Sequence, residues 1–204
     1  MKHASTRALF AYWNEKRANR PAPEREDIDP TAIRHALGDT FMLAADFVNE
    51  QRFRLAGTRI CALFCRELKG ETFTGLWSQS SRSQIAELLS AMTSETVGAV
   101  AGVTGRADNG VQVDLELLIL PLAHRGLGRI RALGALSPVE IPYWIGASPV
   151  TELELGVLRH IGQDVESIVA PRFGSVPESS RLRHGFIVYK GGRGEVPPRS
   201  GRTG

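Results

Sequence analysis

The sequence predicts an α+β domain built on one five-stranded antiparallel sheet, with short helices on one face. Three strand-like stretches follow one another at residues 99–106, 111–122 and 129–136, directly after a helical middle part. Two earlier strand-like stretches lie at residues 40–46 and 52–56. Sequential strands joined by tight turns pair antiparallel, so we expect all five strands to share one sheet.

The composition is that of a globular domain. The chain has 204 residues, of which 42% are apolar and 23% are charged. The longest apolar run spans residues 117–123, whereas a transmembrane helix needs about 20 apolar residues. The first residues lack the apolar core and small-residue cleavage site of a signal peptide. We therefore expect a cytoplasmic protein without a transmembrane segment.

The net charge of +3 is unevenly distributed. Residues 181–204 contain six basic residues against one acidic residue, a net charge of +5, so the preceding 180 residues carry −2. A basic tail can bind nucleic acid or anionic lipid by counterion release, or it can serve only to keep the chain end soluble. No aromatic residue follows Tyr189, which favours a tail that only keeps the chain end soluble. Nucleic acid is therefore not the expected partner.

The N-terminal part predicts two helices. The first spans residues 6–17 and presents an apolar stripe at helical spacing, made of Leu9, Phe10 and Trp13. The proline-rich stretch at residues 20–23 ends it. Asp29 and Pro30 start a short second helix over residues 31–36, because aspartate at the N-cap followed by proline is a favoured order.

The middle part predicts a hairpin and then helices. The strands at residues 40–46 and 52–56 are joined by a turn at Asn49. Apolar residues at helical spacing then predict a short helix over residues 60–68 and an amphipathic helix over residues 81–93.

The strand at residues 111–122 has an unusual pattern. Its first half alternates apolar with polar residues, which makes Asp114 and Glu116 members of a solvated face. In its second half Leu118 and Leu120 make that same face apolar. A sheet face of this kind is covered by another element, for which the Leu9, Phe10 and Trp13 stripe is the candidate. The stripe can come from the same subunit or from a partner.

The pattern after Pro138 is weaker. The segment Pro142-Tyr143-Trp144 predicts a turn with an exposed aromatic pair, residues 153–160 fit a strand or a short helix, and residues 185–190 fit a last strand. These observations divide the chain into a helical extension (1–38), the sheet domain (39–140), a C-terminal extension (141–192) and a disordered basic tail (193–204).

Two long stretches resemble the PAS domain. RFRLAGTRICALFCRELKGETFTGLW at residues 52–77 is similar to the segment from the second PAS strand through its small helices. AGVTGRADNGVQVDLELLILPL at residues 101–122, with residues 133–138, is similar to the last three PAS strands. The chain most resembles a family of stand-alone PAS-like proteins of alphaproteobacteria, through RFRLAGT and three short motifs: Leu9-Phe10-Ala11-Tyr12-Trp13, Asp29-Pro30 and Pro142-Tyr143-Trp144.

The resemblance implies a sensory or regulatory module in bacterial signal transduction. Such a module acts through protein–protein contacts, with or without a small-molecule ligand. The chain has no room for a kinase, cyclase or DNA-binding domain, so we expect a separate signalling protein as the output partner. It contains no G-x-S-x-G, Walker A or H-E-x-x-H motif, and no enzymatic activity is expected.

Two sets of candidate site residues follow from this resemblance. A ligand pocket between the sheet and the short helices would be lined by Phe53, Phe64, Cys65, Phe73, Trp77, Val103, Leu115 and Leu117. The alternative is that most of these residues are simply core, with Trp77 the best candidate for a pocket wall. A homodimer or partner face would contain Leu9, Phe10, Trp13, Leu118 and Leu120.

An alternative function is a flavin- or haem-bound sensor of light, redox state or gas. The Cys65-Arg66 pair resembles the flavin-binding motif of LOV domains, but Phe64 and Lys69 replace the asparagine and glutamine of that motif. Cys61 and Cys65 are four residues apart without a further ligand nearby, so we expect no metal site. A single histidine can hold haem iron, but none of the five is placed in the expected pocket. The expectation is therefore no cofactor.

Overall fold

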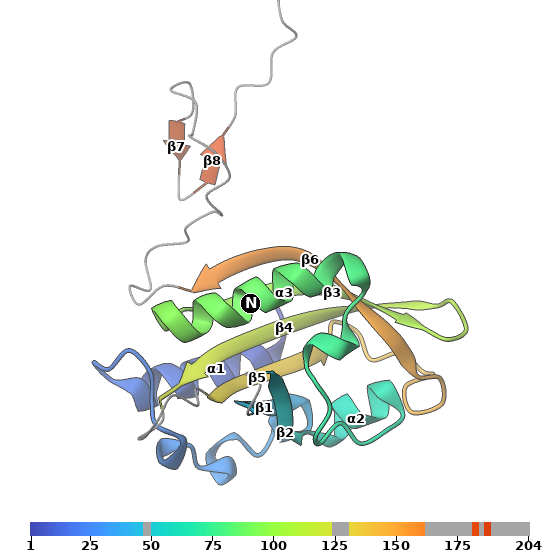
Figure 1. Ribbon diagram of the computed structural model, residues 1–204, viewed down its shortest axis with the longest axis horizontal. Coiled ribbons are helices and arrows are strands. Elements are labelled where there is room, and N and C mark those ends of the chain that lie inside the picture. Colours follow the sequence, from blue (N-terminus) through green and yellow to red (C-terminus); the bar gives the residue numbers. More distant parts are fainter. Residues whose placement is uncertain (47–49, 124–130, 162–180, 184–185, 189–204) are drawn as a thin grey trace, which may run out of the picture. The chain divides into compact units, whose positions relative to one another are not determined.

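The computed structural model describes residues 1–46, 50–123, 131–161, 181–183 and 186–188. The chain divides into two compact units, residues Met1–Ala170 and Pro171–Gly204. The first unit contains one antiparallel sheet of six strands in the order β2-β1-β5-β4-β3-β6 (Figure 1). The predicted α+β class and the single antiparallel sheet are confirmed, whereas the predicted number of five strands is one too few.

The described elements of the first unit are as follows. The strands are β1 (Thr40–Ala45), β2 (Gln51–Ala56), β3 (Gly98–Ala107), β4 (Gln112–Leu122), β5 (Arg131–Pro138) and β6 (Val150–Ile161). The α-helices are α1 (Ala4–Arg17), α2 (Thr58–Phe64) and α3 (Gln79–Glu95). The 3₁₀ helices are η1 (Arg25–Asp27), η2 (Pro30–Ile33), η3 (Leu37–Asp39) and η4 (Thr74–Leu76).

The second unit contains one described hairpin. Strand β7 (Arg181–Arg183) pairs antiparallel with β8 (Phe186–Val188), which lies within the strand expected at residues 185–190. The expected turn at Asn49 and the expected tail at residues 193–204 lie outside the described residues.

The sixth strand is the stretch that fitted either a strand or a short helix. β6 pairs antiparallel with β3 from Ala107 to Gly98, so it gives hydrogen-bond partners to an edge that a five-stranded sheet would leave open. A register irregularity between Leu155 and Leu158 interrupts its alternation of buried and exposed residues. The sequence pattern was ambiguous because a bulge moves the side chains that follow it to the other face.

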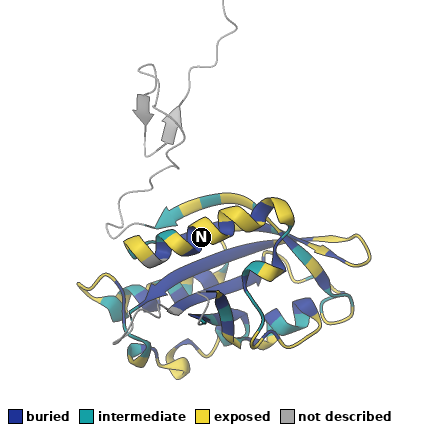
Figure 2. Ribbon diagram, viewed as in Figure 1, coloured by how far each residue is buried: buried dark blue, intermediate teal, exposed yellow. Residues whose placement is uncertain are grey.

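Each face of the sheet is covered by a different set of helices. Helices α2, η4 and α3 cover one face, and a core that includes Phe41, Leu117 and Ile119 lies beneath them. Helix α1 covers the opposite face, over a second core that includes Leu118 and Leu120. We call these two layers the helical core and the α1 core. Figure 2 shows β4 buried almost along its whole length, while α3 and β6 present exposed residues to the outside.

The local boundaries show two differences from the sequence prediction and one agreement with it. Helix α1 begins at Ala4, two residues before the expected start, and the ring Nδ1 of His3 accepts the capping hydrogen bond from the Ser5 N–H. Helix α2 ends at Phe64, four residues early, because Cys65 adopts a left-handed conformation that caps the helix. The predicted Asp29 cap is confirmed, since its carboxylate accepts from the Thr31 N–H.

The predicted aromatic turn is only half exposed. Tyr143 is 99% exposed, but Trp144 is 6% exposed and packs in the helical core. Its neighbour Gly146 donates its N–H to the Ala62 carbonyl of α2, which holds the turn against that helix. The expectation of an exposed pair was wrong for Trp144, because the second aromatic residue anchors the turn instead of facing solvent.

A buried carboxylate holds the start of α1 on the sheet. Glu116 of β4 is 6% exposed and accepts hydrogen bonds from the Thr6 hydroxyl and from the backbone N–H groups of Lys2 and His3 at 2.6 and 2.9 Å. Lys2 and His3 directly precede α1, with His3 as its N-cap, and Thr6 lies in its first turn, so Glu116 holds the N-terminal end of the helix. Asp114, two residues earlier, is exposed, so the predicted solvated face is confirmed for Asp114 and wrong for Glu116.

A second buried carboxylate stands beside this anchor. Asp39, which is 1% exposed, accepts from the Ser5 hydroxyl at 2.6 Å and forms a two-point ion pair with Arg59, with both N–O distances 2.7 Å. The hydrogen bonds to Asp39 raise the pKa of Arg59 above its usual value. Ser5, Asp39 and Arg59 thereby link the first turn of α1 to η3 and to α2.

The buried position of Leu118 leads to a first prediction. Leu118→Arg places a charge in the apolar layer under α1, and we expect it to lower the free energy of unfolding by about 3–5 kcal/mol. The measurement is chemical denaturation of the variant and of Gln112→Arg, an exposed position on the same strand. If the two variants are equally stable, α1 does not cover this face.

The environment of Glu116 leads to a prediction about pH. Burial alone raises the pKa of Glu116, but the hydrogen bonds from Thr6, Lys2 and His3 and the nearby terminal amino group outweigh it and hold the pKa below the usual 4.5. The anchor therefore stabilises the fold above about pH 4.5, and this contribution is lost as the pH falls through the lower, folded-state value. Glu116→Gln should lose about 1–3 kcal/mol at neutral pH and show a flatter decline below pH 4.5.

This comparison is made by urea denaturation at a series of pH values. Asp114→Asn is the matched control, because Asp114 is exposed on the same strand and its carboxylate accepts no hydrogen bond from the described residues. An unchanged acid profile for Glu116→Gln, or the same change for Asp114→Asn, would contradict the anchoring role.

Candidate functional site

Seven of the eight predicted pocket residues lie together in the helical core. They come from β2, α2, the segment around η4, β3 and β4, and all are buried: Phe53, Phe64, Phe73, Trp77, Val103, Leu115 and Leu117. Cys65 is not among them, because it is the residue directly after α2, adopts a left-handed conformation and is exposed. The sheet and the short helices thus bring together side chains that are far apart in the sequence.

Aromatic rings fill the middle of this core. The ring centroid of Phe73 lies 5.5 Å from that of Phe41, 5.7 Å from that of Phe53 and 5.8 Å from that of Trp77. Phe41 was missing from the predicted set, although its position two residues before Leu43 on a predicted strand placed both on one face. The four residues form a packed aromatic cluster at this place.

Two buried polar atoms in this region have no hydrogen-bond partner among the described residues. They are the indole Nε1 of Trp77, whose residue is 1% exposed, and the amide Oε1 of Gln51. Gln51 and Phe53 are two residues apart on β2, so both side chains lie on the helical side of the sheet. A buried polar atom without a partner costs about 1–3 kcal/mol, which makes an unpartnered donor and acceptor the chemical peculiarity of this core.

The two cysteines are separated by the end of α2. The Cys65 thiol contacts the Ala62 carbonyl at 3.5 Å and lies outside the core. Cys61 is half-buried, and burial raises the pKa of its thiol, with Glu67 adding to the effect. The expectation of a buried Cys65 was wrong, because the helix ends one residue before it and turns its side chain outward.

We searched the described residues for side chains that could bind a metal ion or a haem. They contain no group of three or more His, Cys, Asp and Glu side chains that could hold a metal ion. Within the same residues His3 caps α1, His35 is exposed and His160 is on the edge strand β6. The remaining histidines, His124 and His184, and the Gly126-Leu127-Gly128 segment lie outside the described residues.

The predicted partner face is largely covered by its own chain. Leu9, Trp13, Leu118 and Leu120 are buried in the α1 core, and the Trp13 indole N–H donates to the Pro121 carbonyl at 2.8 Å. Phe10 keeps part of its surface exposed and stacks on Trp13. Of the two readings of this face, coverage from the same subunit is the one that the structure shows for these four residues.

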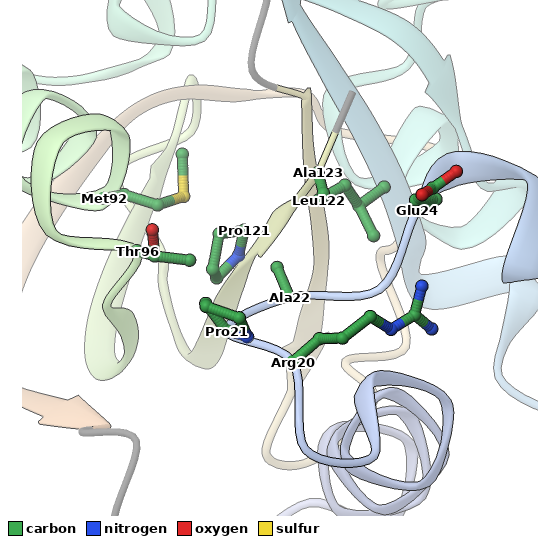
Figure 3. Close-up of a pocket in the computed structure, with 9 residues that line it drawn as sticks. All are labelled: Arg20, Pro21, Ala22, Glu24, Met92, Thr96, Pro121, Leu122 and Ala123. Atoms are coloured by element: carbon green, nitrogen blue, oxygen red, sulfur yellow. The ribbon is translucent and has the colours of Figure 1, made fainter. Parts of the chain in front are cut away.

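An apolar groove lies between the end of α3 and the segment after α1 (Figure 3). Its volume is about 340 Å³, and it is lined by Arg20, Pro21, Ala22, Glu24, Met92, Thr96, Pro121, Leu122 and Ala123. In Figure 3, Met92 and Thr96 face Pro21 and Pro121 across it. The Arg20 guanidinium at its rim is already used, since it forms an ion pair with Asp27 at 2.7 Å.

A second recess lies beside the edge strand β2. It has a volume of about 420 Å³ and is lined by Arg25, Met42, Leu43, Arg54 and Leu55. Two guanidinium groups and three apolar side chains therefore border one space. We call it the two-arginine recess.

No helix in the described part of the chain is long and apolar enough to cross a membrane.

The comparisons with known proteins agree with this architecture. The family model of the PAS domain matches residues 1–137, which include helices α1 to α3 and strands β1 to β4. No curated protein matches the chain. Because the matched residues cover more than half of its length, the chain belongs to the PAS domain family.

Proposed function

We propose that this chain is a non-enzymatic sensory or regulatory module of bacterial signal transduction that acts in the cytoplasm through protein–protein contacts. PAS domains are in general sensory or regulatory modules, and they are typically non-enzymatic and often mediate protein interactions. The finer assignment, to the stand-alone PAS-like family of alphaproteobacteria with a separate signalling protein as output partner, rests on the sequence motifs.

The observation that carries a sensory role is the unpartnered indole N–H of Trp77. It lies in an otherwise apolar, aromatic core, on the same side of the sheet as the unpartnered Gln51 oxygen. A small molecule with an acceptor for Trp77 would satisfy this donor, and its binding would be linked to the packing of Phe73 and of the neighbouring helices. We therefore propose the helical core as the ligand site, with Trp77 as its polar contact.

The flavin or haem alternative has less support. Its motif residue Cys65 lies outside the core, and the described histidines do not lie in it. No specific observation favours a coloured cofactor, and we expect the purified protein to show no absorbance beyond the aromatic band.

Protein contacts have their own candidate surface. Because α1 covers the predicted partner face, we assign the contact to the loop after β5, where three apolar residues are exposed: Val139, Ile141 and Tyr143 at 48%, 66% and 99%. The buried Trp144 and the hydrogen bond from the Val139 N–H to the backbone carbonyl of Asp114 hold this loop at both ends. A homodimer formed through this loop is part of the proposal.

The ligand proposal predicts a bound small molecule. Native mass spectrometry of the protein purified from its own cytoplasm should show an added mass that is released on unfolding. Trp77→Phe keeps a large ring but removes the N–H, so we expect it to reduce the occupancy about tenfold or more. Trp144→Phe, a buried indole in the same core, is the control. A wild-type protein without added mass, together with a Trp77→Phe variant of equal or higher stability, would contradict the ligand site.

The contact proposal predicts a change in mass in solution. Light scattering should show a dimer for the native chain and a monomer for Ile141→Ser combined with Tyr143→Ser. Val157→Ser is the control, because Val157 is an exposed apolar residue (76%) on strand β6. A monomeric native protein, or a dimer that survives the double substitution, would argue against this surface.

A further inference from the structure

The structure assigns a second ligand site, the two-arginine recess, to a small organic phosphate: an oxyanion attached to an apolar body. Trp77 does not line the recess, and Leu43 is the one lining residue that also belongs to the helical core. Arg25 comes from η1, beside α1, and Met42 packs against the α1 core on the opposite side of the sheet. The inference therefore stands independently of the proposed ligand site.

The first argument is the lack of counter-charge. Arg25 and Arg54 line one space, and no carboxylate of the described residues lines it with them. Within the described part of the chain Arg54 has neither a hydrogen bond nor an ion pair, and Arg25 donates only to the Ile28 carbonyl at 3.3 Å. Two like charges that border one recess repel each other until an anion lies between them.

A neighbour on the same strand shows the contrast. Arg52, two residues before Arg54 on β2, forms ion pairs with Asp46 and Glu50, each at 2.7 Å. Arg54 and Arg52 therefore lie on the same face of β2, and Arg52 is paired with two carboxylates of the chain. Arg54 has no such partner, so it is available to an external anion.

The second argument is the apolar part of the lining. Met42 and Leu55 are neighbours across the β1–β2 pairing, next to a register irregularity between Met42 and Leu43. Leu55 is 45% exposed although its strand-mates Phe53 and Gln51 are buried. An apolar group placed against Met42 and Leu55 would remove this surface from water and gain free energy in proportion to the area buried.

The chemistry of the two parts defines the ligand class. Guanidinium groups match the oxygens of phosphate with paired, charge-assisted hydrogen bonds. The volume of about 420 Å³ lies within the range of about 300–1,000 Å³ that is usual for small-molecule sites, which leaves room for an apolar body beside the phosphate. A free inorganic phosphate would use the arginines but not Met42 and Leu55.

The test uses phenyl phosphate as the probe and the full chain as the protein. Titration followed by backbone amide NMR should shift the signals of Arg25, Met42, Arg54 and Leu55, and calorimetry gives the dissociation constant. We expect phenyl phosphate to bind at least tenfold more tightly than inorganic phosphate or benzyl alcohol, each of which offers only one half of the interaction. Higher salt should weaken the binding, because the site is open to solvent.

Substitutions then separate the two guanidinium groups from general charge. Arg25→Gln and Arg54→Gln should each weaken phenyl phosphate binding about tenfold or more, and Arg54→Lys should have a smaller effect because it keeps the charge but not the paired donors. Arg66→Gln is the matched control, since Arg66 is an exposed arginine paired with Glu71 beyond α2. Circular dichroism and thermal unfolding establish that each variant is folded.

Three results would overturn the inference. They are the absence of phenyl phosphate binding at millimolar concentration, equal affinity for inorganic phosphate, and a loss of affinity in Arg66→Gln as large as in Arg54→Gln. None of these results bears on the Trp77 site, whose test is a bound mass and the effect of Trp77→Phe.

Discussion

The fold depends on the burial of both faces of one central strand. Leu117 and Ile119 of β4 lie under α2, η4 and α3, while Leu118 and Leu120 lie under α1. A strand of this kind cannot stay in a two-layer structure, because one of its apolar faces would be exposed to water. The three-layer arrangement of helices, sheet and α1 follows from this constraint, and so does the occupation of the face that was expected to bind a partner.

The same strand also orients the layer that covers it. Glu116 directs its carboxylate at the first turn of α1, and the Ser5, Asp39 and Arg59 contacts extend the attachment to η3 and α2. Apolar burial alone would let a helix slide or rotate on the sheet, whereas directed hydrogen bonds from its N-terminal end set its position. The apolar contacts of the α1 core therefore stabilise the packing of α1, and the polar contacts at its N-terminal end set its position on the sheet.

The sequence was sufficient where a residue's role depends on its near neighbours. The Asp29 cap and the central strands followed from spacing and turn chemistry, and the resemblance to the PAS domain brought seven of the pocket residues together. Prediction failed where an irregularity or a distant contact decided the outcome. A left-handed residue placed Cys65 outside the core, and a bulge obscured β6. No local signal distinguishes the exposed Asp114 from the buried Glu116, because the difference is the first turn of α1, more than a hundred residues earlier in the chain.

The amino-acid sequence by itself determined the class of the fold, the pairing of neighbouring strands and the apolar residues that form the two cores. These features depend on period, turn residues and hydrophobicity, all of which are properties of short segments. Only the tertiary structure decided which helix covers which face, which polar groups remain without a partner, and which charges are neutralised. Trp77 and Arg54 are therefore identified by what surrounds them, since the number of acceptors or carboxylates near a group is a property of the folded chain.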